Sequence, residues 1–406
     1  MLHLAMANKV QMKYLSQIAG LLLFIACGTG DESSVNRAAL TTIDESQVEE
    51  SKLSDFFSDY AFVFLETSSE SLLATSVSKM MVLDRYLFIM DRTPPMGKRR
   101  VMSFDRYTGA FLGQIGTEGK GPEEYAFLVD FTIDPEQKAI LLYSHLGDDR
   151  RMLTYTLDGS FMGATKANDV FFLRDMVVQD SMYVVFNDAS AKPGYYLLKV
   201  NRSDLSKADQ KLEVNPAYFE DGKLSSYEGR SLLWMPADTI YDVTADEPVP
   251  IYAVRLPEDE RAERKEIIKQ PTHDLKIEKK VELFKTGKIS SRMSFFEGAN
   301  YLSYLKITRT EEQMPVHQTV YLFDKRDNRL YDSDHMDYDL FGGYRLPFLL
   351  EMAYADEYVG IIDPIRLLNV GKKEFLDKVP LTEEDHLRFS KLDEMANPIV
   401  LFLKEK

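Results

Sequence analysis

Short apolar runs separated by turn residues recur along the chain from about residue 60 to residue 403. In the first clear unit, Tyr86–Asp91 and Val101–Asp105 have the length of strands and the apolar and aromatic residues that strands favour. Tyr107–Gly109 then forms a turn, and Phe111–Gly113 leads out of it into a further strand. The pattern predicts antiparallel β structure built from short strands.

A second unit repeats this design at an offset of 50 residues. Its strands are predicted at Ala139–Tyr143 and Met152–Tyr155, and Leu157–Gly159 forms its turn. The residues that align are Gly109 with Gly159, Phe111 with Phe161, and Gly113 with Gly163. A self-similar unit of roughly 40–50 residues with several strands is the signature of a propeller blade.

Four weaker copies follow, which makes six units. Their strand-like segments are residues 182–186 with 195–200, 239–243 with 251–254, 301–305 with 319–324, and a last unit from about 338 to 362. We therefore expect an all-β fold, a six-bladed β-propeller. Strand-like segments also lie at 60–65 and 399–403, and we expect one of them to complete a blade with strands from the other end of the chain.

Two charged segments have helical character. Glu258–Lys269 is rich in helix formers and is bounded by prolines. Thr382–Met395 begins with a capping-box-like pair, Thr382 and Asp385. We expect both segments to be short helical insertions on the surface of the ring.

The amino terminus has the layout of a cleaved export signal. Lys13 is followed by the uncharged stretch Tyr14–Ala26, which is too short to span a bilayer comfortably. Leu21–Cys27 resembles the lipobox of bacterial lipoproteins, in which a small residue precedes the lipidated cysteine. We predict that residues 1–26 are a signal peptide, with Met12 as the true start, and that Cys27 carries acyl chains that anchor the protein in a membrane.

Cys27 is the only cysteine, so an internal disulfide is excluded. A catalytic thiol and a buried cysteine of an N-terminal helix are the alternatives, and the position of Cys27 at the end of the apolar run argues against both. Gly28–Gln47 is polar and rich in small residues, which is typical of a flexible tether. We expect the lipidated cysteine and its tether to occupy residues 27–57 and the propeller to occupy residues 58–406.

The chain is acidic, with a formal net charge of −16 over 406 residues. Residues 1–26 hold only two charges, Lys9 and Lys13, so the segment from Cys27 onward is at −18. An acidic body without a concentrated basic patch in its sequence repels phosphate backbones, and we expect no nucleic-acid partner.

Gln114–Tyr125 reads Gln-Ile-Gly-Thr-Glu-Gly-Lys-Gly-Pro-Glu-Glu-Tyr. It resembles the Gly-x-Gly-Pro-Gly-Glu-Tyr signature of the six-bladed β-propeller lipoproteins of anaerobic Gram-negative bacteria, whose propeller is NHL-like. Asn397–Pro398 followed by an apolar strand is also similar to that family. The resemblance implies the fold and a lipid anchor in the cell envelope, at the outer membrane, but no established reaction. The chain departs from the signature at Glu123, where the family usually has Gly, a residue that adopts positive φ far more readily.

The same loop carries three polar groups that form a ligand-binding hypothesis: Lys120, Glu124 and Tyr125. A Walker A phosphate loop is excluded, because Gly121 follows Lys120 where Ser or Thr is needed and Pro122 lacks an amide donor. An interblade turn whose glycines supply unusual dihedral angles is the interpretation that we favour for this loop.

No catalytic, cofactor or metal site is predicted, and catalytic residues stay unknown. Asp332–Asp339 is the densest carboxylate cluster, but it lacks the Gly and the terminal Glu of an EF-hand and is interpreted as a solvated loop. The five histidines after Cys27 are scattered, and the chain has neither a zinc-hydrolase motif nor a Gly-x-Ser-x-Gly elbow.

Two functions remain open. The first is a membrane-anchored binding or scaffold module whose propeller holds a protein, peptide or glycan at the cell envelope. The second is an envelope hydrolase or lyase that acts on a carbohydrate or lactone at the central channel, by analogy with other propellers. Titratable groups at the channel would favour the enzyme, and a broad aromatic or apolar patch would favour the binding module.

Overall fold

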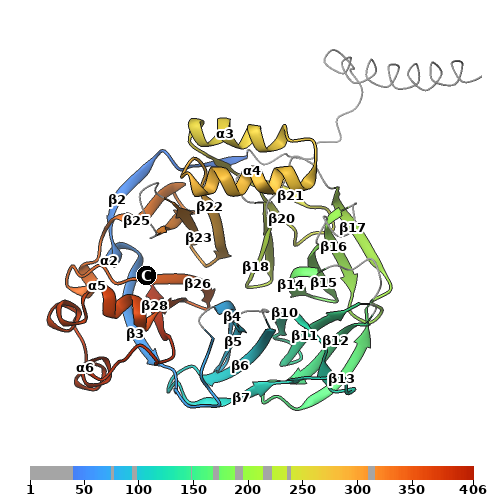
Figure 1. Ribbon diagram of the computed structural model, residues 1–406, viewed down its shortest axis with the longest axis horizontal. Coiled ribbons are helices and arrows are strands. Elements are labelled where there is room, and N and C mark those ends of the chain that lie inside the picture. Colours follow the sequence, from blue (N-terminus) through green and yellow to red (C-terminus); the bar gives the residue numbers. More distant parts are fainter. Residues whose placement is uncertain are drawn as a thin grey trace, which may run out of the picture. The chain divides into compact units, whose positions relative to one another are not determined.

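Six sheets stand around a common axis, and the predicted six-bladed β-propeller is confirmed (Figure 1). Each blade has four antiparallel strands, and two blades carry a fifth strand that runs parallel to their outer strand. The strands coincide with the apolar runs of the sequence, because these residues are buried in the cores between neighbouring blades.

The computed structural model describes residues 40–74, 77–93, 98–147, 149–167, 173–187, 195–213, 222–235, 239–309 and 316–406. Cys27 and the predicted signal peptide lie outside the described residues, and so does the first part of the predicted tether.

Blades one to three are each built from consecutive strands. Blade one consists of β4 (Val77–Leu83), β5 (Tyr86–Thr93), β6 (Lys98–Asp105) and β7 (Phe111–Ile115). Blade two consists of β10 (Leu128–Asp134), β11 (Ala139–Leu146), β12 (Asp149–Thr156) and β13 (Phe161–Lys166). Blade three consists of β14 (Leu173–Gln179), β15 (Met182–Asn187), β16 (Tyr195–Asn201) and β17 (Ala208–Glu213).

Blades four and five follow the same order, and in each of these five blades the first strand is the inner one. Blade four consists of β18 (Lys223–Tyr227), β19 (Arg230–Trp234), β20 (Thr239–Asp242) and β21 (Val249–Arg255). Blade five consists of β22 (Ser291–Glu297), β23 (Tyr301–Thr308), β24 (His317–Asp324) and β25 (Arg329–Asp337).

Blade six joins the two ends of the described chain. Its strands run in order from the inner strand β26 (Phe348–Tyr354) through β27 (Glu357–Ile362) and β28 (Ile399–Glu405) to the outer strand β3 (Phe57–Phe64). β28 pairs antiparallel with β3, and the two labels lie close together in Figure 1. The expectation that a terminal strand completes a blade from the other end is therefore confirmed, and both of the predicted terminal strands take part.

Part of the segment 27–57, which the sequence assigned to the tether, pairs with strands of the ring. β1 (Thr41–Asp44) runs parallel to β21, and β2 (Val48–Lys52) runs parallel to β25. The helical turn α2 (Leu53–Phe56) follows and leads into β3. Only isolated apolar residues of this segment are buried, so its mostly polar composition hides its place in the fold.

Within the described ranges, four longer helices are attached to the ring. α3 (Glu258–Ile268) and α4 (His273–Lys285) lie between blades four and five, and α5 (Pro364–Lys378) and α6 (Glu383–Ser390) lie between β27 and β28. α3 and the start of α6 after its Thr382 cap are as predicted, while α6 ends five residues earlier than predicted. α4 and α5 were not predicted. None of the helices in the described ranges has the length and apolar character that a membrane crossing requires.

A buried ion-pair network ties the N-terminal segment to blade five and α3. Arg292 of β22 donates to both carboxylate oxygens of Glu45, from Nε and Nη2, at 2.6 Å each. Its Nη1 also donates to Glu260 of α3 at 2.9 Å. The side chains of Arg292 and Glu45 are fully buried, so this pairing has to offset a large desolvation cost.

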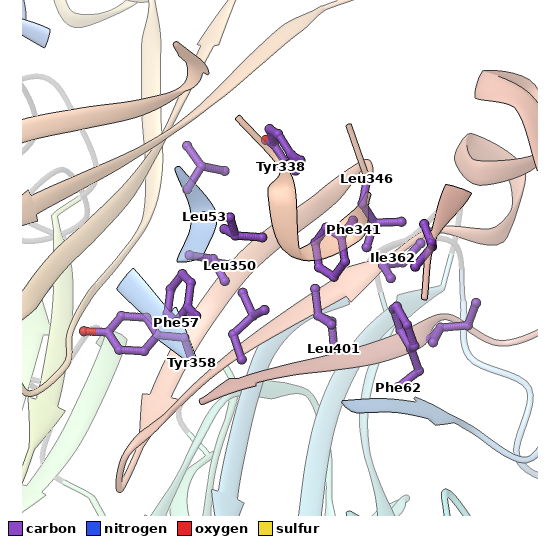
Figure 2. Packing of buried hydrophobic residues seen from close by; sticks show 14 of the residues in the cluster. Leu53, Phe57, Phe62, Tyr338, Phe341, Leu346, Leu350, Tyr358, Ile362 and Leu401 are labelled. Atoms are coloured by element: carbon purple, nitrogen blue, oxygen red, sulfur yellow. The ribbon is translucent and has the colours of Figure 1, made fainter. Parts of the chain in front are cut away.

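The largest hydrophobic core cluster packs against blade six, where β3 and β28 close the ring. Figure 2 shows Phe57 and Phe62 of β3 beside Tyr358 of β27 and Leu401 of β28. The rings of Phe57 and Tyr358 are 5.4 Å apart in an edge-to-face arrangement. Next to this core, the buried Asn397 amide donates to the carbonyl oxygens of Glu66 and Ser71 and accepts from an amide of the same connection. The Asn-Pro pair noted in the sequence thus fixes the link from β3 to β4 against β28.

Candidate functional site

Each of the six inner strands contributes one polar side chain near the axis of the ring. Together these residues form what we call the polar ring. Its members are Lys79 of β4, Asp130 of β10, Asp175 of β14, Lys223 of β18, Ser294 of β22 and Glu351 of β26. Hydrogen bonds, ion pairs and electrostatic interactions connect them from blade to blade.

A recurring β-bulge explains why the polar residues collect there. The inner strands β4, β10, β14, β22 and β26 each show a register shift against their neighbour, which lies directly before the member of the polar ring in the first three strands and at that member in β22 and β26. A bulge leaves a residue out of the ladder and redirects the side chains around it. The repeated irregularity therefore turns polar groups of separate blades toward one another.

Lys79 bridges three blades. Its Nζ lies 2.9 Å from Asp130 Oδ2 and 2.9 Å from Asp175 Oδ1. The Met176 amide donates to Asp130 Oδ2 at 3.0 Å and to Asp175 Oδ1 at 3.1 Å. Burial would lower the pKa of Lys79, but the two carboxylates outweigh burial and raise it.

The two carboxylates differ in their surroundings. Burial raises the pKa of Asp130, and Lys79 offsets only part of that effect. Asp175 is equally buried, but it also faces Lys223 at 3.4 Å and accepts a hydrogen bond from the Leu224 amide at 3.0 Å. These groups, together with Lys79, outweigh burial and lower the pKa of Asp175. All four oxygens of the pair are thus occupied by protein donors.

Glu351 and Lys223 are the members of the polar ring that retain capacity for a ligand. Glu351 is partly buried and accepts a hydrogen bond only from Ser294 Oγ, at 3.4 Å, among the residues that the structure describes. Burial raises its pKa to about 7, against the opposing charge of Lys223. The Lys223 side chain is 35% exposed. Glu351, a carboxyl group that titrates near neutrality, therefore interacts electrostatically with the cation Lys223 within the polar ring.

The loop that carried the ligand-binding hypothesis lies between blades one and two. Its short strands β8 (Thr117–Glu118) and β9 (Glu124–Tyr125) pair with each other in parallel. The Glu124 carboxylate accepts the Gly121 amide at 2.8 Å, and Tyr125 is buried in the core between the blades. Lys120 is exposed. The three side chains thus lie in different surroundings and do not converge on one point.

The glycines of this loop serve its folding. A Cβ on Gly119 would lie 1.8 Å from a carboxylate oxygen of Glu124, so the carboxylate fills the space that a side chain would take. Glu123 is not among the described residues with positive φ, so the Glu at this signature position adopts an ordinary backbone conformation. A pocket of about 410 Å³ adjoins the loop and is lined by Tyr155 and Phe161 of blade two. The interblade-turn interpretation accounts for these contacts, and the ligand-binding hypothesis for the loop stays a prediction.

The carboxylates of the Asp332–Asp339 segment have partners of their own. Asp332 accepts the amides of two following residues and contacts His335, and Asp334 contacts His317 and Thr319. Asp339 accepts both the amide and the hydroxyl of Ser54. Within the described ranges, no group of three or more His, Cys, Asp or Glu residues is placed to hold a metal ion.

The sequence did not reveal the polar ring, because its members stand far apart in the chain and each is a single polar residue in an apolar strand. One signal was present in three blades. Lys79, Asp130 and Asp175 each directly precede a buried apolar residue of an inner strand. An alignment of the units on that position would have brought these three residues into one column.

The bridging role of Lys79 can be tested by substitution. Lys79→Met leaves Asp130 and Asp175 buried without their shared cation, and we expect the free energy of unfolding to fall by about 3–5 kcal/mol in urea denaturation at neutral pH. Lys138→Met is the control, because Lys138 pairs with Asp84 at 2.8 Å in an exposed position and its loss should cost less than about 1 kcal/mol. Equal effects of the two substitutions would contradict the bridging role.

The raised pKa of Glu351 predicts a pH dependence of stability. Because the pKa is about 7 in the folded protein and 4.5 without the fold, the folded state binds more protons between these values. The stabilising effect is complete below the lower value and is lost as the pH rises through the higher one. Between about pH 4 and pH 8, the stability of Glu351→Gln relative to the native protein should rise by about 1–3 kcal/mol. The exposed Glu136→Gln should show no such change, and a flat difference for Glu351→Gln would refute the assignment.

Comparison with one solved structure supports the fold. A putative exported protein of Bacteroides fragilis has a solved structure that is 18% identical, with a TM-score of 0.65 over 90% of this chain and 100% of that chain. A member of the DUF4221 family from Bacteroides vulgatus is 10% identical, with a TM-score of 0.46 over 89% of this chain and 98% of that chain. No curated protein matches the sequence. The family model described as "Domain of unknown function (DUF4934)" matches residues 40–404, and the chain therefore belongs to this family.

Proposed function

We propose that the protein is a membrane-anchored, exported binding module that holds an envelope ligand at the axial end of its propeller, with Lys223 and Glu351 in contact with the ligand. The observation that carries this proposal is the polar ring. Among its members, only Lys223 and Glu351 keep a capacity for ligand contacts that no other described residue uses. The resemblance of the fold to an exported protein is consistent with a place outside the cytoplasm.

Asp130 and Asp175 already accept hydrogen bonds from protein donors, which favours a binding function over a hydrolase. Glycoside hydrolysis in its usual form needs two carboxyl groups that face the same bond, one as acid and one as base or nucleophile. Asp130 and Asp175 hold Lys79 and backbone amides, so in the described ring only Glu351 is open to a ligand. A single open carboxyl group and a neighbouring lysine suit a binding site with two charges of opposite sign.

The second candidate function, an envelope lyase, rests on Glu351 itself. A carboxyl group with a pKa of about 7 is suited to abstract a proton near neutral pH, and Lys223 would stabilise the negative charge that develops on the substrate. Proton abstraction from an acidic carbohydrate needs only one such base. Turnover of polygalacturonate that Glu351→Gln abolishes would establish this function over simple binding.

The anchor part of the proposal concerns Cys27. In cells fed a fatty-acid probe, we expect the native protein to be labelled and to sediment with membranes, because acyl chains on the thiol supply the anchor. Cys27→Ser should lose the label and leave the membrane fraction. A native protein without label would refute lipid anchoring.

The binding part is tested with the soluble protein from residue 40 onward. Glycan and peptide arrays identify the best ligand, and calorimetric titration then measures its dissociation constant. We expect Lys223→Ala combined with Glu351→Gln to weaken binding about tenfold or more, because charged groups at the centre of an interface dominate affinity. Lys138→Ala combined with Glu136→Gln is the matched control. An unchanged dissociation constant for the first variant would place the ligand elsewhere.

A further inference from the structure

Ser294 of the polar ring has a backbone conformation that serine rarely adopts. Its φ angle is +50°, in the left-handed region that favours glycine. The other non-glycine residues with positive φ in the described ranges lie in turns between strands, except Leu212 of the outer strand β17. Ser294 is thus the one described residue of this kind inside an inner strand.

The bulge of β22 imposes this conformation. Two residues of β22, Ser294 and Phe295, stand opposite the single residue Tyr304 of β23. The Phe295 side chain is buried in the core, whereas Ser294 is partly exposed and its Oγ donates to Glu351 Oε2 of blade six at 3.4 Å. Glycine would adopt this φ angle without strain, so the strained serine points to a function of its hydroxyl group.

The pair of Ser294 and Glu351 presents hydrogen-bond acceptors and no donor. The hydroxyl proton of Ser294 is used on Glu351, and the lone pairs of Oγ remain. Ionised Glu351 has only acceptors, and its Oε1 accepts no hydrogen bond from the part of the chain that the structure describes. The group that complements this pair carries several donors and no acceptor.

Glu351 also differs from the aspartates of the polar ring in its charge partners. Asp130 and Asp175 each lie 2.9 Å from Lys79, and Lys223 lies 3.4 Å from Asp175. Among the described residues, Glu351 forms no ion pair, and Ser294 is its hydrogen-bond partner. An ammonium group has donors only and a positive charge, so it complements both the acceptors and the charge of the pair.

The surroundings of the pair favour an ammonium group at the end of an apolar stem. Both residues have apolar neighbours on either side in their own strands, namely Leu350 and Met352 in β26 and Met293 and Phe295 in β22. A lysine side chain carries its ammonium group on a flexible aliphatic stem, which can lie against apolar surface. On an amino sugar the ammonium group is attached directly to a ring of hydroxyl groups, which need partners of their own.

We propose that Ser294 and Glu351 bind the ammonium group of a lysine side chain, which a peptide or protein partner presents at the axial end of the ring. This role rests on the proposed binding function and names the class of its ligand. Lys223, which offers only donors, contacts a carbonyl or carboxylate oxygen of the same partner.

The preference for lysine is measured with the soluble protein and a library of short capped peptides. The central residue is Lys, acetyl-lysine, Arg or Glu, the flanking residues vary, and physiological salt screens the net charge of the chain. We expect peptides with a central Lys to be enriched over those with acetyl-lysine, because acetylation removes the charge and the ammonium donors. Oligomers of glucosamine, titrated against the best Lys peptide, represent the amine on a glycan.

Ser294→Gly separates the strain from the function. Because glycine adopts positive φ readily, we expect this variant to unfold at a higher temperature than the native protein. Calorimetric titration should nevertheless show about tenfold weaker binding of the best Lys peptide, because the variant lacks the Oγ acceptor and the contact that orients Glu351. Glu351→Gln should abolish the preference for Lys over acetyl-lysine.

Ala355→Gly is the matched control. Ala355 has a φ angle of +52° in the turn between β26 and β27, so glycine relieves the same kind of strain outside the polar ring. This variant should also gain thermal stability, but its dissociation constant for the Lys peptide should equal that of the native protein.

Lysine recognition would be refuted if acetyl-lysine or Arg peptides bind as tightly as Lys peptides, or if glucosamine oligomers bind more tightly. Native affinity of Ser294→Gly would also refute it, and a lower unfolding temperature of this variant would mark the hydroxyl as purely structural. If the best ligand carries no amine and the Lys223 and Glu351 double variant still weakens its binding, the proposed binding function stands and only lysine recognition fails.

Discussion

Closure of the ring is the constraint on which the other contacts depend. β3 and β28 come from opposite ends of the described chain, and the aromatic core of blade six exists only when they pair. With the ring closed, the inner strands are held around one axis, and Lys79 can contact aspartates of two further blades. The ion pairs at the axis depend on this arrangement, because their attraction offsets the cost of burial only in good geometry.

The blade pattern was predictable because a strand buried on both faces needs a continuous apolar run. The apolar runs at Tyr86–Asp91 and Ala139–Tyr143 predicted β5 and β11 in this way. The aligned turn residues Gly109 and Gly159 both adopt positive φ. α5 was not predicted, although Asp363 caps it and Pro364 opens it. It lies directly after the last predicted blade unit, and a kink at Gly371 interrupts the helical pattern.

The candidate site was not predictable in the same way, because its residues are brought together only when the chain folds. Lys79 and Glu351 come from the first and the last blade, and a single charged residue in a strand gives no local sign that it faces an axis. The loop at Gln114–Tyr125 attracted attention because its glycines form a motif, yet the contacts of Glu124 and Tyr125 are those of a folded connection. The spacing of the glycines reflected the backbone conformation that this turn requires. The charged groups that meet in the polar ring came from single positions far apart in the chain.

The parallel strands β1 and β2 have a consequence for how copies of this protein meet. An uncovered outer strand presents backbone donors and acceptors that can add a strand of another molecule. β1 and β2 occupy those groups on blades four and five, and the buried pair of Glu45 and Arg292 fixes the segment between them. The sheets of the other four blades end at β7, β13, β17 and β3. β1 and β2 are now the outer strands of blades four and five, and with four and five residues they offer a strand of another molecule only a short edge for pairing.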